Sequence, residues 1–250
     1  MKNASLKLLA VALTLWLSQS SCGTLTDISP PQDELIPIVD ANPYYLSSKS
    51  IGSFKVDPPP PIHSIADQSY LQALKHAQAT RTEGDCKRAQ AEANPINPEY
   101  QEFFGSMSPF ARPIGGEERD FFIHVWSDAS IVSEVFKKKY DWPRAYTTDK
   151  TLIPCLKKID SPSFPSTHAL VSRTFALVLA EIDPKNSDRY LDRANLIAKD
   201  RLLAGMHRPN ELKAGQELAD QIFAEFLKSK RFTEDLARMR AIAIKNSETK

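Results

Sequence analysis

The stretch over residues 168–182 constrains the fold most, because it is apolar almost all round. A helix with hydrophobic side chains on every side is buried in the centre of a protein. The stretch is also shorter than the roughly 20 residues that a membrane-spanning helix needs. We therefore expect it to form the central helix of a bundle, covered by helices from the rest of the chain.

The rest of the sequence has helical periodicity and no alternating strand pattern of any length. Further helices are expected over residues 65–79, 83–93, 98–104, 117–139, 186–204, 211–228 and 233–245. A chain of 250 residues suits one good-sized domain. The sequence therefore predicts an all-α protein, whose single helical bundle domain covers residues 62–246.

Residues 1–21 have the pattern of a signal peptide. Lys2 and Lys7 supply the positive start, residues 8–17 the short apolar stretch, and residues 18–21 the small polar cleavage region. No later segment offers an unbroken apolar run of membrane length. We therefore expect an exported protein of the periplasm.

Residues 22–61 are rich in Pro, Ser and Asp, and they end in a run of prolines at 58–61. Such a segment lacks backbone donors and favours the polyproline II conformation. It is expected to be an extended lead-in to the helical domain.

Cys22 follows Ser20 and Ser21, at the place where a bacterial lipoprotein carries its lipidated cysteine, although Gln19 stands where that signal prefers Leu. Two fates are open for Cys22: lipidation, which would tether the protein to a membrane, or simple cleavage without an anchor. We expect no other contact with a membrane.

Cys86 and Cys155 are the two other cysteines of the chain. Export would place them in an oxidising compartment, where they are free to form a disulfide. The sequence permits this bond and does not establish it.

The net charge of +1 argues against a nucleic-acid-binding protein, which would carry a basic surplus. Positive charge is instead concentrated locally, at residues 137–139 and 157–158 and at Arg144, Arg201 and Arg208. These groups either focus a positive potential on one pocket or lie scattered in solvent.

The peptide Pro165-Ser166-Thr167-His168 opens the apolar stretch. Ser before an apolar helix is an N-cap signature, and the free N–H groups of a first helical turn bind phosphate oxygens. On this peptide alone, Ser166 could equally be a simple cap, with His168 in the first turn by chance.

His207 lies between Gly205, which can end one helix, and Pro209, which suits the opening of the next. Glu211 follows four residues after His207 and can reach one nitrogen of its imidazole ring. A carboxylate in that role fixes the tautomer and leaves the other nitrogen free to attack an electrophile. The alternative is a capping histidine near an acidic first turn.

Lys137 and Arg144 stand seven residues apart, and Pro143 prevents a smooth helix between them. Lys137 would end a helix and Arg144 would lie on the following loop. Two cations held in this way can grip a tetrahedral anion from two sides.

The three fragments resemble the signature of the type 2 phosphatidic acid phosphatase superfamily. That signature runs Lys, six residues, Arg-Pro; then Pro-Ser-Gly-His; then Ser-Arg, five residues, His, three residues, Asp. The chain matches it at Lys137, Arg144, Pro165, Ser166, His168, Arg201 and His207. Residues 54–70 are similar to the Pro-rich lead-in and first helix of the bacterial class A non-specific acid phosphatases, so the resemblance covers most of residues 54–225.

The resemblance implies the helical bundle of the acid phosphatase and vanadium haloperoxidase type, and a role for each matched residue. His207 would take the phosphoryl group, Glu211 would orient it, and His168 would protonate the leaving oxygen. The phosphate oxygens would be held by Lys137, Arg144, Ser166, Arg201 and the backbone N–H of Thr167. The implied activity is that of an acid phosphatase for small phosphomonoesters, with inorganic phosphate or vanadate as ligands and with no metal and no other cofactor.

Four positions depart from the signature: Ala145 replaces Pro, Thr167 replaces Gly, Glu211 replaces Asp, and Asp200 replaces the Ser beside Arg201. A carboxylate of Asp200 that faced the phosphate would repel it, so Asp200 either turns away to a cation or weakens the activity. These departures leave a non-catalytic, exported anion-binding protein as an alternative. A vanadate-dependent haloperoxidase is a further one, although the chain is short for it. Substrate specificity is expected in a pocket rim over residues 105–116.

Overall fold

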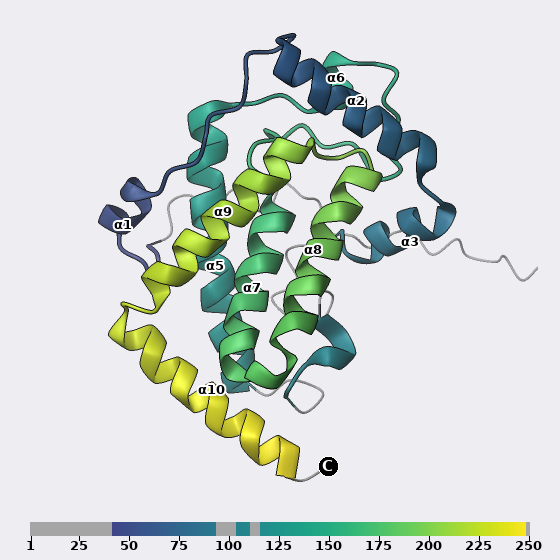
Figure 1. Cartoon of the computed structure of the whole chain (residues 1–250). Helices are drawn as coiled ribbons and strands as arrows, with labels where there is room; N and C mark the ends of the chain where they lie inside the picture. Colours follow the sequence, from purple (N-terminus) through teal and green to yellow (C-terminus); the bar gives the residue numbers. More distant parts are fainter. Residues whose placement is uncertain (1–41, 94–103, 111–115, 249–250) are drawn as a thin grey trace, which may run out of the picture. The chain divides into compact units, whose positions relative to one another are not determined.

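The computed structural model describes residues 42–93, 104–110 and 116–248. Every regular element among them is helical, which confirms the all-α fold (Figure 1). The expected signal peptide, Cys22 and nearly all of the expected helix at 98–104 lie outside the described residues. The α-helices are α1 (Ser48–Ser53), α2 (Ile65–Thr80), α3 (Glu83–Ala91), α5 (Gly116–Tyr140), α6 (Ala145–Thr148), α7 (Thr167–Ile182), α8 (Ser187–Leu203), α9 (Pro209–Phe226) and α10 (Lys230–Glu248), with 3-10 turns η2 (Gly105–Met107) and η3 (Pro184–Asn186).

Helix α7 is the centre of this arrangement, as its apolar sequence predicts. It packs against α5, α8 and α9, and Figure 1 shows it between them. Ten of its side chains are buried, from Ala169 at its start to Ile182 at its end. Burial of one large apolar side chain contributes about 1.5–3 kcal/mol. The first turn of α7 is therefore held in place by the core beneath it.

Gly215 brings α9 unusually close to the first turn of α7. A Cβ atom at this position would lie 2.6 Å from the carbonyl oxygen of Ser166 and 3.1 Å from the backbone nitrogen of Leu170. The Ser166 N–H also donates to the carbonyl oxygen of Glu211, at 3.0 Å. The absence of a side chain at Gly215 thus allows the starts of the two helices to meet.

The described part of the expected lead-in belongs to the packed domain. Tyr45, Leu46, Ile51 and Phe54 are buried in the main hydrophobic core, and α1 forms among them. Asp128 of α5 accepts the backbone N–H groups of residues 44, 45 and 46 at 2.6, 2.8 and 2.9 Å. This differs from the extended lead-in expected for residues 22–61, because the apolar side chains of the segment pack in the core and its backbone N–H groups bind a buried carboxylate.

Helix α3 is attached to the neighbouring segments by a disulfide between Cys86 and Cys155. The backbone N–H of Cys155 donates to the carbonyl oxygen of Ala204, at 3.0 Å, just after α8. The disulfide therefore joins α3 to a segment that already contacts the end of α8. No helix within the described ranges is long and apolar enough to cross a membrane.

The close approach at Gly215 predicts a specific sensitivity to a single methyl group. Gly215→Ala should lower the free energy of unfolding by about 1–3 kcal/mol, because the new methyl group overpacks the contact between α9 and α7. Urea unfolding would measure the change. Gly52→Ala is the matched control, because Gly52 is an exposed helical glycine with no atom near the added Cβ. Equal effects of the two substitutions would contradict this account of the packing.

Candidate active site

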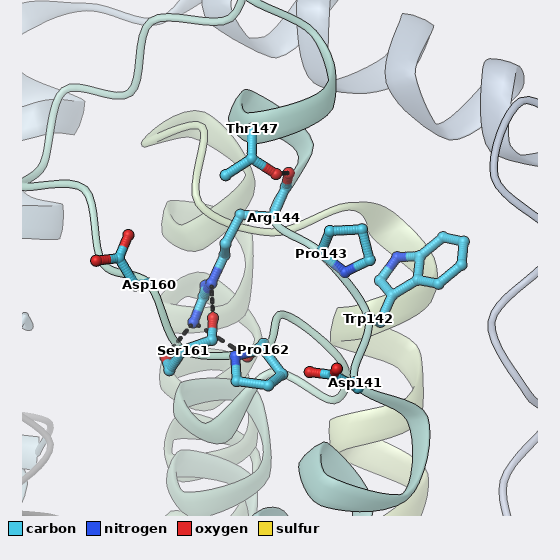
Figure 2. A pocket seen from close by; sticks show the side chains of 8 residues that line it. All are labelled: Asp141, Trp142, Pro143, Arg144, Thr147, Asp160, Ser161 and Pro162. Carbon is cyan, nitrogen blue, oxygen red and sulfur yellow. Dashed lines mark hydrogen bonds between the residues drawn. The ribbon is translucent and has the colours of Figure 1, made fainter.

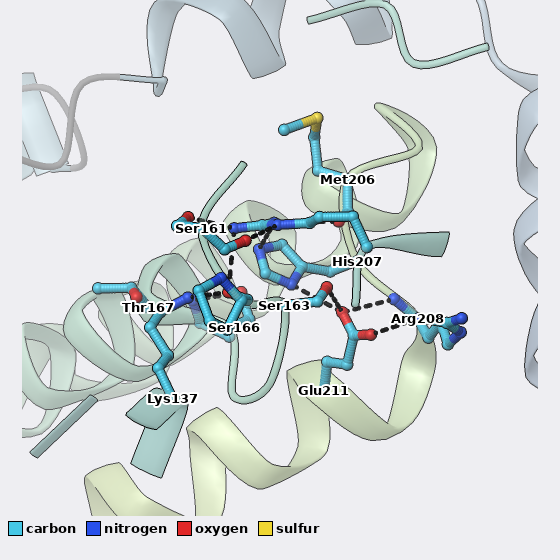
Figure 3. Close-up of polar contacts among 12 residues, drawn as sticks. Lys137, Ser161, Ser163, Ser166, Thr167, Met206, His207, Arg208 and Glu211 are labelled. Carbon is cyan, nitrogen blue, oxygen red and sulfur yellow. Dashed lines mark hydrogen bonds and ion pairs between the residues drawn. The ribbon is translucent and has the colours of Figure 1, made fainter. Parts of the chain in front are cut away.

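Three segments that are far apart in the sequence meet at the start of α7. They are the end of α5 with the loop after it, the residues just before α7, and the corner between α8 and α9. Figure 3 shows side chains from all three directed toward one another, among them Lys137, Ser163, Ser166, His207 and Glu211. The structure thus brings together the cations, the helix N-terminus and the histidine that the sequence singles out.

Ser166 caps α7 as its sequence context predicts. Its side chain accepts the N–H of Ala169 at 3.4 Å and is completely buried. The Thr167 hydroxyl lies 2.7 Å from the hydroxyl of Ser133 on α5, so its side chain is directed at that helix. The Thr side chain at the position where the signature has Gly is therefore accommodated by a neighbouring helix, and the first-turn N–H groups remain at the site.

His207 lies at the corner that Gly205 makes possible. Gly205 has a φ of +79°, which favours glycine, and its backbone closes the turn after α8. The Nδ1 atom of His207 is 2.9 Å from the Glu211 carboxylate, and its Nε2 atom is 3.0 Å from Nη1 of Arg144. A guanidinium group can only donate. Nε2 therefore carries the lone pair, and the Nδ1 proton is donated to Glu211.

The charges of this pair follow from its surroundings. Burial and the positive charge of Arg144 lower the pKa of His207 to about 3. Burial opposes ionisation of Glu211, but the hydrogen bond from His207 and the charge of Arg208 prevail and lower its pKa to about 2. The ligand-free site accordingly holds a neutral imidazole beside an ionised carboxylate, which is the state that a nucleophilic nitrogen requires.

Glu211 is surrounded by donors that no sequence motif indicates. It accepts the Ser163 hydroxyl at 2.6 Å, the backbone N–H of Arg208 at 3.1 Å, and Nη1 of Arg208 at 3.0 Å. Arg208 is itself fully buried, and its Nε lies 3.2 Å from the carboxylate of Asp67 on α2. The longer side chain of Glu, where the signature has Asp, therefore still reaches His207 and is held there from several sides.

Lys137 and Arg144 both bind the loop at residues 161–162. Lys137 donates from Nζ to the carbonyl oxygen of Pro162 at 2.5 Å, and Arg144 donates from Nε to that of Ser161 at 2.9 Å. Burial, and then the charge of Arg144, lowers the pKa of Lys137 to about 7. The two cations are therefore held close to each other by the same loop. Because their positive charges repel each other, a bound anion would stabilise both.

A cavity of about 250 Å³ opens beside Arg144. Figure 2 shows the Arg144 side chain directed from the cavity wall toward Ser161 and Pro162. Two carboxylates, those of Asp141 and Asp160, also line the cavity. On its inner side Arg144 contacts His207, so its guanidinium lies between the cavity and the imidazole.

Asp200 is turned away toward α3. Both of its carboxylate oxygens accept from Arg88, each at 2.7 Å, and the side chain is fully buried. Of the two outcomes expected for Asp200, the structure shows the one in which it pairs with a cation. Its charge is compensated locally by Arg88.

Arg201 and His168 both contact Glu92, the residue directly after α3. Arg201 donates from Nη2 to the carbonyl oxygen of Ala89 at 2.6 Å and to the carboxylate of Glu92 at 3.2 Å. Nε2 of His168 lies 3.1 Å from the carbonyl oxygen of Glu92, and since a carbonyl can only accept, Nε2 carries a proton. Burial, and then the charge of Arg201, holds the pKa of His168 well below its usual value. The charge of Arg144 contributes to the lowered pKa of both His168 and His207.

No group of three or more His, Cys, Asp or Glu side chains suited to a metal ion occurs in the described part of the chain. The site contains the cations Lys137 and Arg144, whose donors suit an anion. A phosphate oxygen near Ser166 would meet the helix N-terminus, the Lys137 ammonium group and the neutral His207 ring.

The buried pair of Arg208 and Asp67 predicts a large stability effect. Asp67→Asn should lower the free energy of unfolding by about 1–3 kcal/mol, because Arg208 loses the carboxylate at Nε and keeps Glu211 as its counter-ion. Thermal or urea unfolding would measure this. Glu83→Gln, which removes one partner of an exposed ion pair with Lys87, should change the stability little. A loss no larger than that of this control would show that Asp67 does not support the site.

No family model matches the chain. A non-specific acid phosphatase from Providencia stuartii is 26% identical over 220 residues, which cover 84% of this chain and 87% of that protein. Among solved structures, a transmembrane PAP2-type phosphatidylglycerolphosphate phosphatase from Bacillus subtilis has a TM-score of 0.48 and 16% identity, covering 78% of this chain and 94% of that one. The relative from Providencia stuartii confirms the resemblance expected from the three fragments: over most of its length the chain is similar to a bacterial non-specific acid phosphatase.

Proposed function

We propose that this protein is a metal-independent acid phosphatase that hydrolyses small phosphomonoesters through a phosphohistidine at His207. The observation that carries the proposal is the state of His207. Its Nδ1–H is held by the ionised Glu211, and its Nε2 lone pair faces a cluster of positive groups. The similarity to a non-specific acid phosphatase over 84% of the chain supports the same reaction class.

In the first step, the Nε2 lone pair of His207 attacks the phosphorus atom. The bond between phosphorus and the ester oxygen breaks, and His168 gives a proton to the departing oxygen. Glu211 stabilises the positive charge that develops on the imidazole, in the way that a carboxylate supports the histidine of a triad. The negative charge of the bound phosphate favours the protonated form of His168, whose pKa is lowered in the ligand-free site.

In the second step, water attacks the phosphohistidine. His168 accepts a proton from this water, the bond between phosphorus and Nε2 breaks, and inorganic phosphate leaves. Each step exchanges one bond to phosphorus for another, so the residues mainly position the phosphoryl group and stabilise its charge. The proton that His168 loses in the first step is regained in the second.

The phosphate oxygens would be held by Lys137, Arg144, Ser166, Arg201 and the N–H of Thr167. Arg144 now donates to the His207 lone pair, the position that phosphorus must reach. An incoming phosphate would take over this donor, which releases Nε2 and keeps the guanidinium charge in place. Inorganic phosphate and vanadate, which offer the same tetrahedral oxygens, should bind as ligands.

We also propose that the protein is exported to the periplasm, with residues 1–21 as a signal peptide and either a lipid-bearing or a free Cys22. The disulfide between Cys86 and Cys155 suits an oxidising compartment. The catalytic domain would comprise the helices over residues 62–246 together with the packed segment that contains α1.

The proposal is tested by hydrolysis of p-nitrophenyl phosphate at about pH 5 to 6 in the presence of EDTA. His207→Ala should lower kcat/KM at least about a thousandfold. His76→Ala is the control, because His76 is exposed on α2 and should leave the rate unchanged. Alkaline quenching followed by mass spectrometry should find phosphate on His207. Binding of phosphate without any turnover would instead support the non-catalytic anion-binding protein.

The lowered pKa of Lys137 predicts an alkaline limit to activity. A lysine is charged below its pKa, so kcat/KM should fall as the pH rises through about 7. Lys137→Met should lower kcat/KM by about 100-fold to 1000-fold below that pH, because the phosphate loses a buried cation. Lys137→Arg should keep activity at higher pH, since Arg stays protonated.

Lys138→Met is the control for the alkaline limit, because Lys138 is exposed on the same turn of α5. It should leave the pH profile unchanged. An alkaline limit that stays near the same pH in Lys137→Arg would show that another group titrates.

A further inference from the structure

Glu92 is the residue directly after α3, and its side chain is buried beside two groups that the mechanism needs, Arg201 and His168. Only 1% of its surface is exposed. One carboxylate oxygen accepts from Nη2 of Arg201 at 3.2 Å, and the other forms an ion pair with Arg193 at 2.7 Å. Its backbone carbonyl oxygen lies 3.1 Å from Nε2 of His168. One residue thus engages a phosphate-binding cation and the proton donor at the same time.

The contact with Glu92 limits how Arg201 can bind phosphate. A guanidinium group grips an oxyanion with two donors through either of two edges, and both edges include Nη2. The two hydrogens of this Nη2 are taken by the carbonyl of Ala89 and the carboxylate of Glu92. Nε of Arg201 is buried and has no hydrogen-bond partner among the described residues. Among the described residues, Nε of Arg201 thus remains available to a ligand. Nη2, which either edge needs for a two-donor contact with phosphate, is already engaged.

We propose that Glu92 is an internal competitor of the substrate: its carboxylate occupies Arg201, and the phosphate group must displace it to be gripped by both donors of one edge. This inference rests on the proposed phosphatase function and identifies a residue that sets the affinity of the site. The residue that competes for Arg201 also contacts the proton donor, through its backbone carbonyl oxygen.

Protonation of Glu92 would weaken this competition. Burial raises the pKa of Glu92, and the charges of Arg193 and Arg201 offset only part of that rise. The charged or titratable groups that face Glu92 are Arg193, Arg201 and Asp200 of α8 and His168 of α7, and Asp200 is compensated by Arg88. Because the raised pKa belongs to a carboxyl group, Glu92 becomes neutral as the pH falls. Acid would thus favour the phosphate over the carboxylate.

Isothermal titration with inorganic phosphate tests the competition directly, on the full domain with its disulfide intact. At about pH 7, Glu92→Gln should bind phosphate about tenfold more tightly than the wild type, because the neutral amide competes less for Arg201. The ratio should shrink as the pH falls, because the wild-type carboxyl, whose pKa is raised by burial, then takes up its proton. The ionisation of phosphate itself affects both proteins equally and cancels in the ratio.

Asp85→Asn is the matched control, because it also removes a negative charge from α3 and Asp85 bonds to Arg88 rather than to Arg201. It should leave the phosphate affinity within about twofold of the wild type. An equal gain in Asp85→Asn and Glu92→Gln would reduce the effect to general electrostatics and overturn the proposal. Unchanged or weaker binding in Glu92→Gln would also overturn it, because Glu92 would then only position Arg201.

Glu92→Asp decides the question if Glu92→Gln does not fold. It keeps the charge that Arg193 and Arg201 require, but it withdraws the carboxylate by one methylene group. Tighter phosphate binding than in the wild type supports the proposal, and equal or weaker binding contradicts it. Failure of the phosphatase assay in the wild type would refute the proposed function separately, since the phosphate affinities are measured without turnover.

Discussion

The buried carboxylate of Glu211 is the interaction on which the site depends. An ionised group without contact to water is unfavourable by several kcal/mol unless donors surround it. Here the donors come from His207, Ser163 and Arg208. Arg208 in turn contacts Asp67 on α2, so the compensation of one charge extends across the domain. This one charge therefore links the segment before α7, the corner between α8 and α9, and helix α2.

The helices could be predicted from the sequence wherever burial follows the helical period. The centre of the bundle, α7, begins and ends close to where its apolar pattern does. The segment with α1 could not be predicted in this way. Its burial depends on the distant Asp128, whose carboxylate binds three backbone N–H groups. Nothing in the local sequence of this Pro- and Ser-rich segment indicates that it binds Asp128.

The candidate site likewise contains some residues that could be predicted from the sequence and others that could not. The convergence of Lys137, Arg144, Ser166 and His207 was implied by the resemblance of the three fragments to the phosphatase signature. The supporting residues Ser163, Asp67 and Glu92 were not predicted, because each acts through a contact made only in the folded state. The direction of Asp200 was open for the same reason: its partner Arg88 is 112 residues away in the chain.

The disulfide of Cys86 gives α3 a role beyond packing. A helix of nine residues is marginal by itself and holds its position through what it is attached to. A carboxylate on a tethered helix has a high effective concentration at its partner, far above that of a dissolved ion. If Glu92 competes with phosphate as proposed, the disulfide raises the phosphate concentration that the site needs, because it helps to hold this carboxylate near Arg201. Reduction would leave α3 held by the peptide chain and by contacts such as the ion pair between Arg88 and Asp200, and the required concentration would fall.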